Sequence, residues 1–278
     1  MPKLDVLVVG ATGQLGGVVA RALLQGGHHV RALTRNLAHP AADVLRLRGA
    51  RLAWAGIDDT ARMEDVAAGA DAIFAVTTPA AGPAAETRHG MALIELAGRL
   101  DIPHLVYSSS MQASAITGAE HSDSKHEVEQ YLRASAVPYT IVCPGYFMEN
   151  LLERDCVERL RRGELALPLR DDERLQQIAR PDAGRFMRVV LERRSDFLGQ
   201  RVCIASDELT PIEMAATLAR VLGHSVTCVT TCTASDAPCP GAGACADVVG
   251  LRSRFPEVNW HTLDGWAKRQ DWTTGDSG

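Results

Sequence analysis

The chain has 278 residues, 46% of them hydrophobic and 23% charged, which is enough to bury the core of one large domain or of a large domain with a small lobe. Its 34 acidic and 29 basic side chains give a net charge of −5, so it has no basic field for a phosphate backbone and we expect no nucleic-acid partner. The short apolar run near the N-terminus follows Asp5 and predicts a core strand, not a signal peptide or a membrane span, so we expect a cytoplasmic protein without membrane contact.

The most informative segment is residues 6–17, VLVVGATGQLGG, in which an apolar strand runs into a glycine-rich turn and a helix. Gly10 allows the tight turn, Gly13 has no side chain to block a phosphate, and Gly16 lets the helix pack close to the sheet. The free N–H groups at the start of that helix then face an anion. This spacing predicts the pyrophosphate site of a dinucleotide, with a ligand-free turn as the alternative.

Along the whole first half, short apolar runs bounded by turn residues alternate with longer helical patterns. This alternation is typical of a parallel sheet covered by helices, and right-handed crossovers make that sheet doubly wound, with ligands at the carboxyl ends of its strands. The predicted strands cover residues 4–9, 29–33, 51–55, 72–76, 104–107 and 139–142, and the predicted helices between them cover residues 14–25, 60–68, 84–100 and 124–134.

The pattern changes after the sixth predicted strand, where a helix over residues 148–161 is followed by short strands and by amphipathic helices over residues 181–191 and 211–222. The sequence therefore predicts a dinucleotide-binding Rossmann domain over residues 1–147, with its sheet partly completed by later segments. A smaller α+β lobe over residues 148–278 is predicted to bind the substrate.

Four of the seven cysteines, Cys228, Cys232, Cys239 and Cys245, lie in or beside a Pro/Gly/Ala-rich stretch over residues 231–246 that predicts a surface loop. Their spacing lacks the paired knuckles and partner histidines of a zinc site. We therefore expect no metal, and we interpret the cysteines as buried small hydrophobes or free thiols.

Charged residues after the second and third predicted strands bear on the identity of the cofactor. The second strand ends in TRN, where an NAD site would place an acid for the ribose 2′-hydroxyl, and Arg35 instead offers a guanidinium suited to a 2′-phosphate. This predicts NADP(H), with an exposed strand-end arginine as the alternative. Asp58 and Asp59 follow the third strand and are placed to meet the adenine amino group, unless one of them caps the helix that begins near Thr60.

The fifth strand ends in VYSSS, residues 106–110, and Lys125 follows on the next predicted helix. Hydroxyl groups and a lysine at the mouth of one sheet suit the polarisation of a carbonyl and the binding of a nicotinamide ribose, which the ammonium group would hold. The alternative is a solvent-facing lysine on an exposed helix.

These segments together resemble the NmrA-like branch of the atypical short-chain dehydrogenase/reductases over nearly the whole chain. The resemblance is carried by VLVVGATGQLG, RALTRN, VYSSS, SKHEVEQYLRASAVPYTIVCPGYFMENLL and DELTPIEMAATLARVLG. It implies a Rossmann domain, NADP(H) binding, and relatives that reduce triphenylmethane dyes, quinones or isoflavones or that only sense the NADPH/NADP ratio. The cofactor-binding residues that we predict are Gly10, Thr12, Gly13, Gln14, Leu15, Gly16, Arg35, Asp58, Thr77, Thr78, Ser108, Lys125, Pro144, Gly145, Tyr146 and Phe147.

The chain departs from the pattern of this group at two positions. Ordinary short-chain dehydrogenases have a tyrosine four residues before the lysine, where this chain has His121, and Cys143 stands where we expect an arginine in many relatives. The proton donor is then His121, Tyr146 or Tyr107, or none is needed for an electron-poor acceptor such as a quinone. A further alternative makes His121 a loop residue in front of the helix. The catalytic residues that we predict are Lys125, His121, Ser110 and Tyr146.

These features predict an NADPH-dependent reductase of a small conjugated or carbonyl-containing molecule, quinone-like or a natural-product intermediate, bound between residues 146–148 and the C-terminal lobe. A regulatory protein that senses NADP(H) without turnover and a redox-neutral tailoring enzyme are the alternatives. The only partner predicted is the small-molecule substrate. The sequence leaves its identity and the oligomeric state open, a homodimer included.

Overall fold

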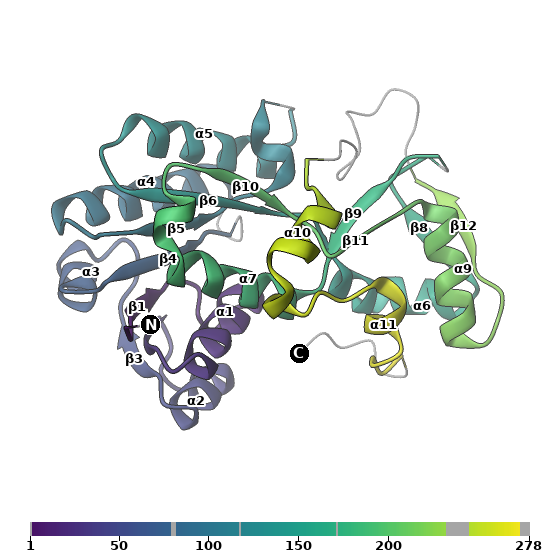
Figure 1. The fold of residues 1–278 in the computed structure, drawn as a ribbon, viewed down its shortest axis with the longest axis horizontal. Coiled ribbons are helices and arrows are strands. Elements are labelled where there is room, and N and C mark those ends of the chain that lie inside the picture. The colour runs from purple at the N-terminus through teal and green to yellow at the C-terminus, as the bar shows by residue number, and fades with distance from the viewer. Residues whose placement is uncertain (1, 79–81, 117, 171, 232–244, 273–278) are drawn as a thin grey trace. The chain divides into compact units, whose positions relative to one another are not determined.

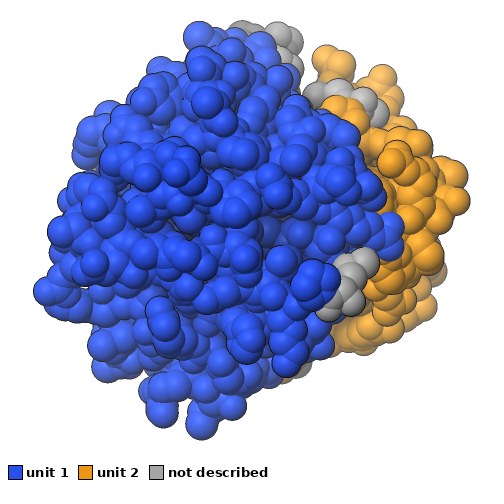
Figure 2. Space-filling view, turned by 60° about the vertical axis from the view of Figure 1, so that its left-hand side comes forward, with its two compact units in different colours: residues 1–143, 183–202 blue, residues 144–182, 203–278 orange. Residues whose placement is uncertain are grey.

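The chain divides into two units, which Figure 2 colours separately: residues 1–143 with 183–202, and residues 144–182 with 203–278. The computed structural model describes residues 2–78, 82–116, 118–170, 172–231 and 245–272, without the side chains of Glu120 and His121.

The predicted doubly wound parallel sheet is confirmed, and seven strands form it in the order β10-β6-β5-β4-β1-β2-β3. The order reverses between β1 and β4, which is where such sheets bind ligands. The strands are β1 (Asp5–Val8), β2 (His29–Thr34), β3 (Arg51–Trp54), β4 (Ala72–Val76), β5 (Leu105–Ser108), β6 (Tyr139–Pro144) and β10 (Arg201–Ile204).

Helices cover both faces of this sheet (Figure 1), as the apolar, nearly continuous strands require. The first unit also contains a 3-10 helix, η2 (Met111–Ser114), and a short α-helix, α8 (Arg194–Phe197). One face carries α1 (Gln14–Gln25), α2 (Pro40–Leu47) and α7 (Arg180–Glu192), and the other carries α3 (Thr60–Ala67), α4 (Pro83–Arg99) and α5 (Glu120–Ala134). The sequence pattern missed α2. This helix has Pro40 at its first position, and its N-cap residue is His39, whose side chain accepts a hydrogen bond from the N–H of Ala41.

The two units differ in extent from the predicted domains over residues 1–147 and 148–278. The first unit ends at Cys143, and residues 183–202 return to it from beyond the second unit's first segment. Gly184 of α7 packs so closely on Val18 of α1 that a Cβ there would lie 2.8 Å from the Val18 carbonyl oxygen. The chain then adds to the edge of the sheet, where the N–H of Gly199 donates to the Tyr139 carbonyl oxygen over 2.7 Å.

His104 ties this returning segment to the sheet and should make the protein acid-sensitive. Its Nε2 lies 2.8 Å from Oγ1 of Thr140, whose hydroxyl donates to the carbonyl oxygen of Phe197. Burial, with a smaller contribution from the charge of Arg194, lowers the pKa of His104 to about 4. Its imidazole is therefore neutral in the folded protein at a pH where the unfolded chain already binds a proton.

We expect the free energy of unfolding to fall by about 3 kcal/mol from this residue as the pH drops from 6.5 to 4, because the unfolded state binds the extra proton over that range. Urea unfolding at pH 7.5 and at pH 4.5 measures it, with His104→Gln as the comparison. A wild-type pH dependence that persists unchanged in His104→Gln would exclude His104 as its source.

The second unit has its own sheets and its own apolar core. One sheet has the order β11-β9-β7 and the other pairs β12 with β8. Its strands are β7 (Tyr146–Phe147), β8 (Glu164–Leu167), β9 (Leu175–Ile178), β11 (Asp207–Leu209) and β12 (Thr227–Thr230). Its helices are η3 (Met148–Leu152), α6 (Arg154–Arg161), α9 (Pro211–Leu222), α10 (Val248–Arg254), η4 (Pro256–Val258) and α11 (Leu263–Ala267). The single helix predicted over residues 148–161 is wrong, because Glu153 adopts an extended backbone (φ −60°, ψ 141°) between η3 and α6.

Candidate functional site

A cavity of about 190 Å³ lies in the first unit at the carboxyl ends of β1, β2, β3 and β4. This is the edge of the sheet at which doubly wound folds bind ligands. Its lining brings together several of the predicted residues: Gly10, Thr12, Arg35, Asp58, Thr77 and Thr78, joined by His89 of α4.

The glycine turn needs its glycines for steric reasons. Gly10 has φ +73°, and a Cβ there would also lie 2.8 Å from Val76 of β4. A Cβ at Gly16 would overlap the backbone carbonyl of Gly10. Gly13 is the N-cap of α1 and has no side chain to cap the helix, so no N-cap side chain competes with an anion for the first amide groups of α1.

Arg35 is held at the cavity by a tryptophan. Nε1 of Trp54 donates to the Arg35 carbonyl oxygen over 3.2 Å, and the Arg62 guanidinium lies 3.8 Å from the centre of the Trp54 ring. The Arg35 side chain is exposed at this rim, which leaves its guanidinium accessible to a phosphate.

The two consecutive aspartates after β3 have separate positions. Asp59 caps α3 by accepting a hydrogen bond from the N–H of Arg62, over 3.2 Å. Asp58 lines the cavity, and its Oδ2 lies 3.2 Å from Nε2 of His89. The sequence pattern did not identify His89, because only the folding of α4 against the end of β3 brings it to Asp58.

Lys125 is buried in an ion pair, so the alternative of a solvent-facing lysine is wrong. Its Nζ lies 2.9 Å from Oε1 of Glu86, which has no exposed surface, and 3.4 Å from the Thr77 carbonyl oxygen. Glu86 also accepts hydrogen bonds from Oγ1 of Thr77 over 3.0 Å and from Oγ of Ser124 over 2.8 Å. Because the Thr77 proton goes to Glu86, the hydroxyl of Tyr107 donates to Oγ1 of Thr77 over 3.1 Å. Burial raises the pKa of Tyr107 above its ordinary value.

The three serines at the end of β5 and directly after it, residues 108–110, also have different surroundings. Ser108 is buried, and Oγ of Ser110 accepts a hydrogen bond from Gln112 as the N-cap of η2. Oγ of Ser109 donates to Glu129 of α5 over 2.5 Å.

Cys143 stands where an arginine is expected in many relatives, and an arginine of another strand lies close to it. Arg201 of β10 contacts the buried Glu129 through Nε over 2.9 Å, and the Cys143 thiol lies 3.8 Å from the same carboxylate. Burial raises the pKa of Cys143 to about 12, so the thiol stays protonated.

His121 belongs to α5, which begins at Glu120, four residues before its predicted start. The alternative of a loop residue in front of the helix is therefore wrong. Its side chain lies outside the described part of the chain, and its catalytic role stays a prediction.

The turn over residues 144–147 belongs to the second unit. A Cβ at Gly145 would overlap the backbone carbonyl of Gln176, so only glycine fits where the turn approaches β9. Tyr146 pairs with Gln177 of β9, and burial raises the pKa of its hydroxyl above the ordinary value. The Arg180 guanidinium lies 5.9 Å from the centre of the Phe147 ring.

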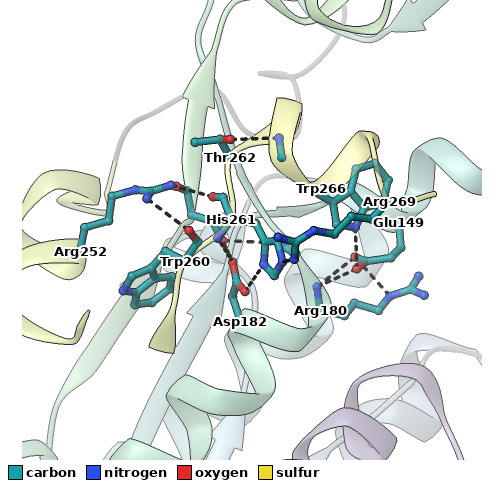
Figure 3. Close-up of polar contacts among 12 residues, drawn as sticks. Glu149, Arg180, Asp182, Arg252, Trp260, His261, Thr262, Trp266 and Arg269 are labelled. Atoms are coloured by element: carbon teal, nitrogen blue, oxygen red, sulfur yellow. Dashed lines mark hydrogen bonds and ion pairs between the residues drawn. The ribbon is translucent and has the colours of Figure 1, made fainter. Parts of the chain in front are cut away.

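A buried aspartate anchors the C-terminal segment of the second unit (Figure 3). Asp182 has no exposed surface and accepts hydrogen bonds from Ser206 over 2.6 Å and from both the N–H (2.8 Å) and Nδ1 (2.6 Å) of His261. Nε2 of His261 accepts from Arg269 over 3.0 Å. In the same view Glu149 accepts from the Arg180 N–H over 3.0 Å and from Trp266 over 3.3 Å.

The interpretation of all cysteines as free or simply buried is wrong for one pair. Cys203 and Cys245 form a disulfide, a long-range pairing that the spacing could not indicate. Cys232 and Cys239 lie outside the described residues. Within residues 2–78, 82–116, 118–170, 172–231 and 245–272 no group of three or more His, Cys, Asp or Glu side chains could hold a metal ion, and no helix is long and apolar enough to cross a bilayer.

Comparison with known proteins gives a family match over most of the chain. The model of the NmrA-like family matches residues 2–234. An NmrA-like family domain-containing oxidoreductase of Aspergillus japonicus is 33% identical over 160 residues, which are 53% of this chain and 48% of that protein. An NAD(P)H azoreductase of Xenophilus azovorans is 31% identical over 164 residues, 59% of this chain and 55% of that protein. The matches thus span about half the length of these relatives.

Solved structures share the fold over nearly the full length. NmrA, a negative transcriptional regulator in complex with NADP, has a TM-score of 0.82 and 22% identity and covers 99% of this chain and 100% of its own. An NADPH-dependent quinone oxidoreductase of Escherichia coli complexed with NADPH has a TM-score of 0.72 and 21% identity, over 97% of this chain and 92% of its own.

Proposed function

Because this chain belongs to the NmrA-like family, we propose that it is an NADPH-dependent reductase of a small conjugated or carbonyl-containing molecule. The observation that carries the proposal is the cavity at the ends of β1 to β4, where an uncapped helix N-terminus and the Arg35 guanidinium offer donors to two phosphate positions. The names of the oxidoreductase, azoreductase and quinone oxidoreductase relatives support the reaction class.

NADPH fits the donor set of this cavity, and when bound it supplies the hydride. The amide groups at the start of α1, which no side chain caps, would hold the pyrophosphate, Arg35 the 2′-phosphate and Asp58 the adenine amino group. Lys125 would hold the nicotinamide ribose while the Glu86 carboxylate holds its ammonium group in place.

For the proton that accompanies the hydride, we propose one of three of the predicted catalytic groups: the hydroxyl of Ser110, the hydroxyl of Tyr146 or the imidazole of His121. Tyr107 is a poor donor to a substrate, since its hydroxyl already donates to Thr77 in a buried network. A quinone or another electron-poor acceptor would make this proton transfer unnecessary at the moment of hydride transfer.

A sensor of NADP(H) without turnover is the second candidate. It is supported by the likeness to the NADP-bound regulator NmrA. It is also supported by the contacts that occupy two potential catalytic groups, Lys125 with Glu86 and Tyr107 with Thr77. Steady oxidation of NADPH with a panel of quinones and azo dyes separates the two functions. Turnover of any acceptor supports the reductase, and tight NADPH binding with no turnover across the panel supports the sensor.

Arg35→Ala should remove the preference for the phosphorylated cofactor. We expect the wild type to bind NADPH more tightly than NADH by about 1.5 to 3 kcal/mol, the range for hydrogen bonds to a charged group. Calorimetric titration of both cofactors measures the difference, and Arg62→Ala is the control because that guanidinium stacks on Trp54 instead of lining the cavity. Equal affinities in the wild type, or an undiminished preference in Arg35→Ala, would reject Arg35 as the phosphate ligand.

A further inference from the structure

His89 lies in the wall of the cofactor cavity, although nothing in the sequence pattern around it indicates a site. It is on α4, one turn after Glu86, and residues three apart on a helix lie on the same side. Glu86 is directed to Lys125 and His89 to Asp58. One side of α4 therefore supports two separate parts of the proposed site.

His89 is the residue that restrains the exposed side chain of Asp58. The Asp58 side chain is 83% exposed, whereas that of His89 is only 20% exposed. A solvated carboxylate samples several rotamers, and fixing it costs entropy at the moment a ligand binds. A carboxylate only accepts hydrogen bonds, so Nε2 of His89 is the donor over the 3.2 Å that separate it from Oδ2 of Asp58.

The second oxygen of Asp58 is left for a ligand. Within the described part of the chain no side chain or N–H group donates a hydrogen bond to Oδ1, while Asp58 lines the cavity beside Ile57. An acceptor at the end of β3, beyond the Arg35 rim, suits a base that presents an N–H donor.

We infer that His89 is a positioning residue that holds Asp58 to read the 6-amino group of the cofactor's adenine, and so sets the specificity for adenine over 6-oxopurines. This inference rests on the proposed function, because it needs the dinucleotide in this cavity. Adenine presents an amino donor at position 6, whereas hypoxanthine presents an acceptor there that the carboxylate would repel.

The test compares the affinities of NADP+, its hypoxanthine analogue and NAD+ for the full chain by calorimetry. We expect the wild type to bind NADP+ about tenfold or more tightly than the hypoxanthine analogue, the low end for one hydrogen bond to a charged group. In His89→Ala this ratio should fall to within about threefold of one, while the ratio of NADP+ to NAD+ affinity, which Arg35 sets, stays unchanged. His89→Gln, whose amide can still donate to Asp58, should keep much of the wild-type ratio.

Two further variants sharpen the result. Asp58→Asn places an amide donor against position 6 and should invert the preference towards the hypoxanthine analogue. His29→Ala is the matched control, since His29 is exposed at the amino end of β2, away from the carboxyl ends that line the cavity. A wild-type ratio near one, or a ratio that survives in His89→Ala, would overturn the inference while NADP+ still binds. Failure of all three dinucleotides to bind would instead overturn the proposed function.

Discussion

Glu86→Ala should lower the free energy of unfolding by about 3–5 kcal/mol, the cost of leaving a buried charge without its partner. Glu86 has no exposed surface, and its carboxylate contacts the Lys125 ammonium group over 2.9 Å while it accepts hydrogen bonds from Thr77 and Ser124. Its removal leaves the Lys125 ammonium group and the hydroxyl groups of Thr77 and Ser124 buried without this acceptor. Urea unfolding followed by circular dichroism measures the change.

The same ion pair allows a stricter test with a double variant. Lys125→Met alone should be similarly destabilising, whereas Glu86→Met combined with Lys125→Met removes both charges and should recover much of the loss. Arg88→Ala on the exposed side of α4 is the control and should change stability by less than about 0.5 kcal/mol. Additive losses in the double variant would show that the two side chains are not coupled.

Because Lys125 contributes to stability as well as to the proposed cofactor site, its variants must be shown to fold before their NADPH affinity is compared with that of the wild type. A loss of NADPH affinity in Lys125→Ala means a lost contact only if the variant is folded under the conditions of the titration. Single-turnover rates of His121→Phe across pH 5 to 9 then separate the two residues, because we expect His121 to alter only substrate binding or the pH dependence of the rate.

Asp182→Ala should destabilise the second unit by about 3–5 kcal/mol, because three donors lose one buried acceptor group. The carboxylate receives hydrogen bonds from Ser206 and from two N–H groups of His261, all of 2.8 Å or less. Arg252 supports the same segment through the carbonyl oxygens of Ser206 and His261. Without Asp182 we expect the segment that carries Trp260 and Trp266 to detach first.

Tryptophan fluorescence and limited proteolysis measure this detachment, since Trp260, Trp266 and Trp272 all belong to the second unit. Asp155→Ala, on the exposed surface of α6 in the same unit, is the control. Wild-type unfolding curves and cleavage patterns in Asp182→Ala would contradict an anchoring role for Asp182.

The sequence by itself determined that the first unit has a doubly wound parallel sheet, and it located six of the seven strands. The helix over residues 14–25 and the strand over residues 72–76 agree with their predicted bounds, because apolar periodicity and glycine or proline at the boundaries are local properties. The glycine turn and Arg35 were also readable, since each lies at a strand end that the pattern defines.

Only the tertiary structure decided which distant side chains meet. Four polar pairs join residues that are 31 or more positions apart along the chain, too far for one helix to bring together. They are Glu86 with Lys125, Asp58 with His89, Glu129 with Arg201, and Asp182 with His261. A buried charge is stabilised by whichever opposite charge the fold brings to it, and residues far apart in sequence leave no periodic signal of that contact. For the same reason the return of residues 183–202 to the sheet was not assigned, because the pairing of a strand with the edge of a sheet depends on the strand already there.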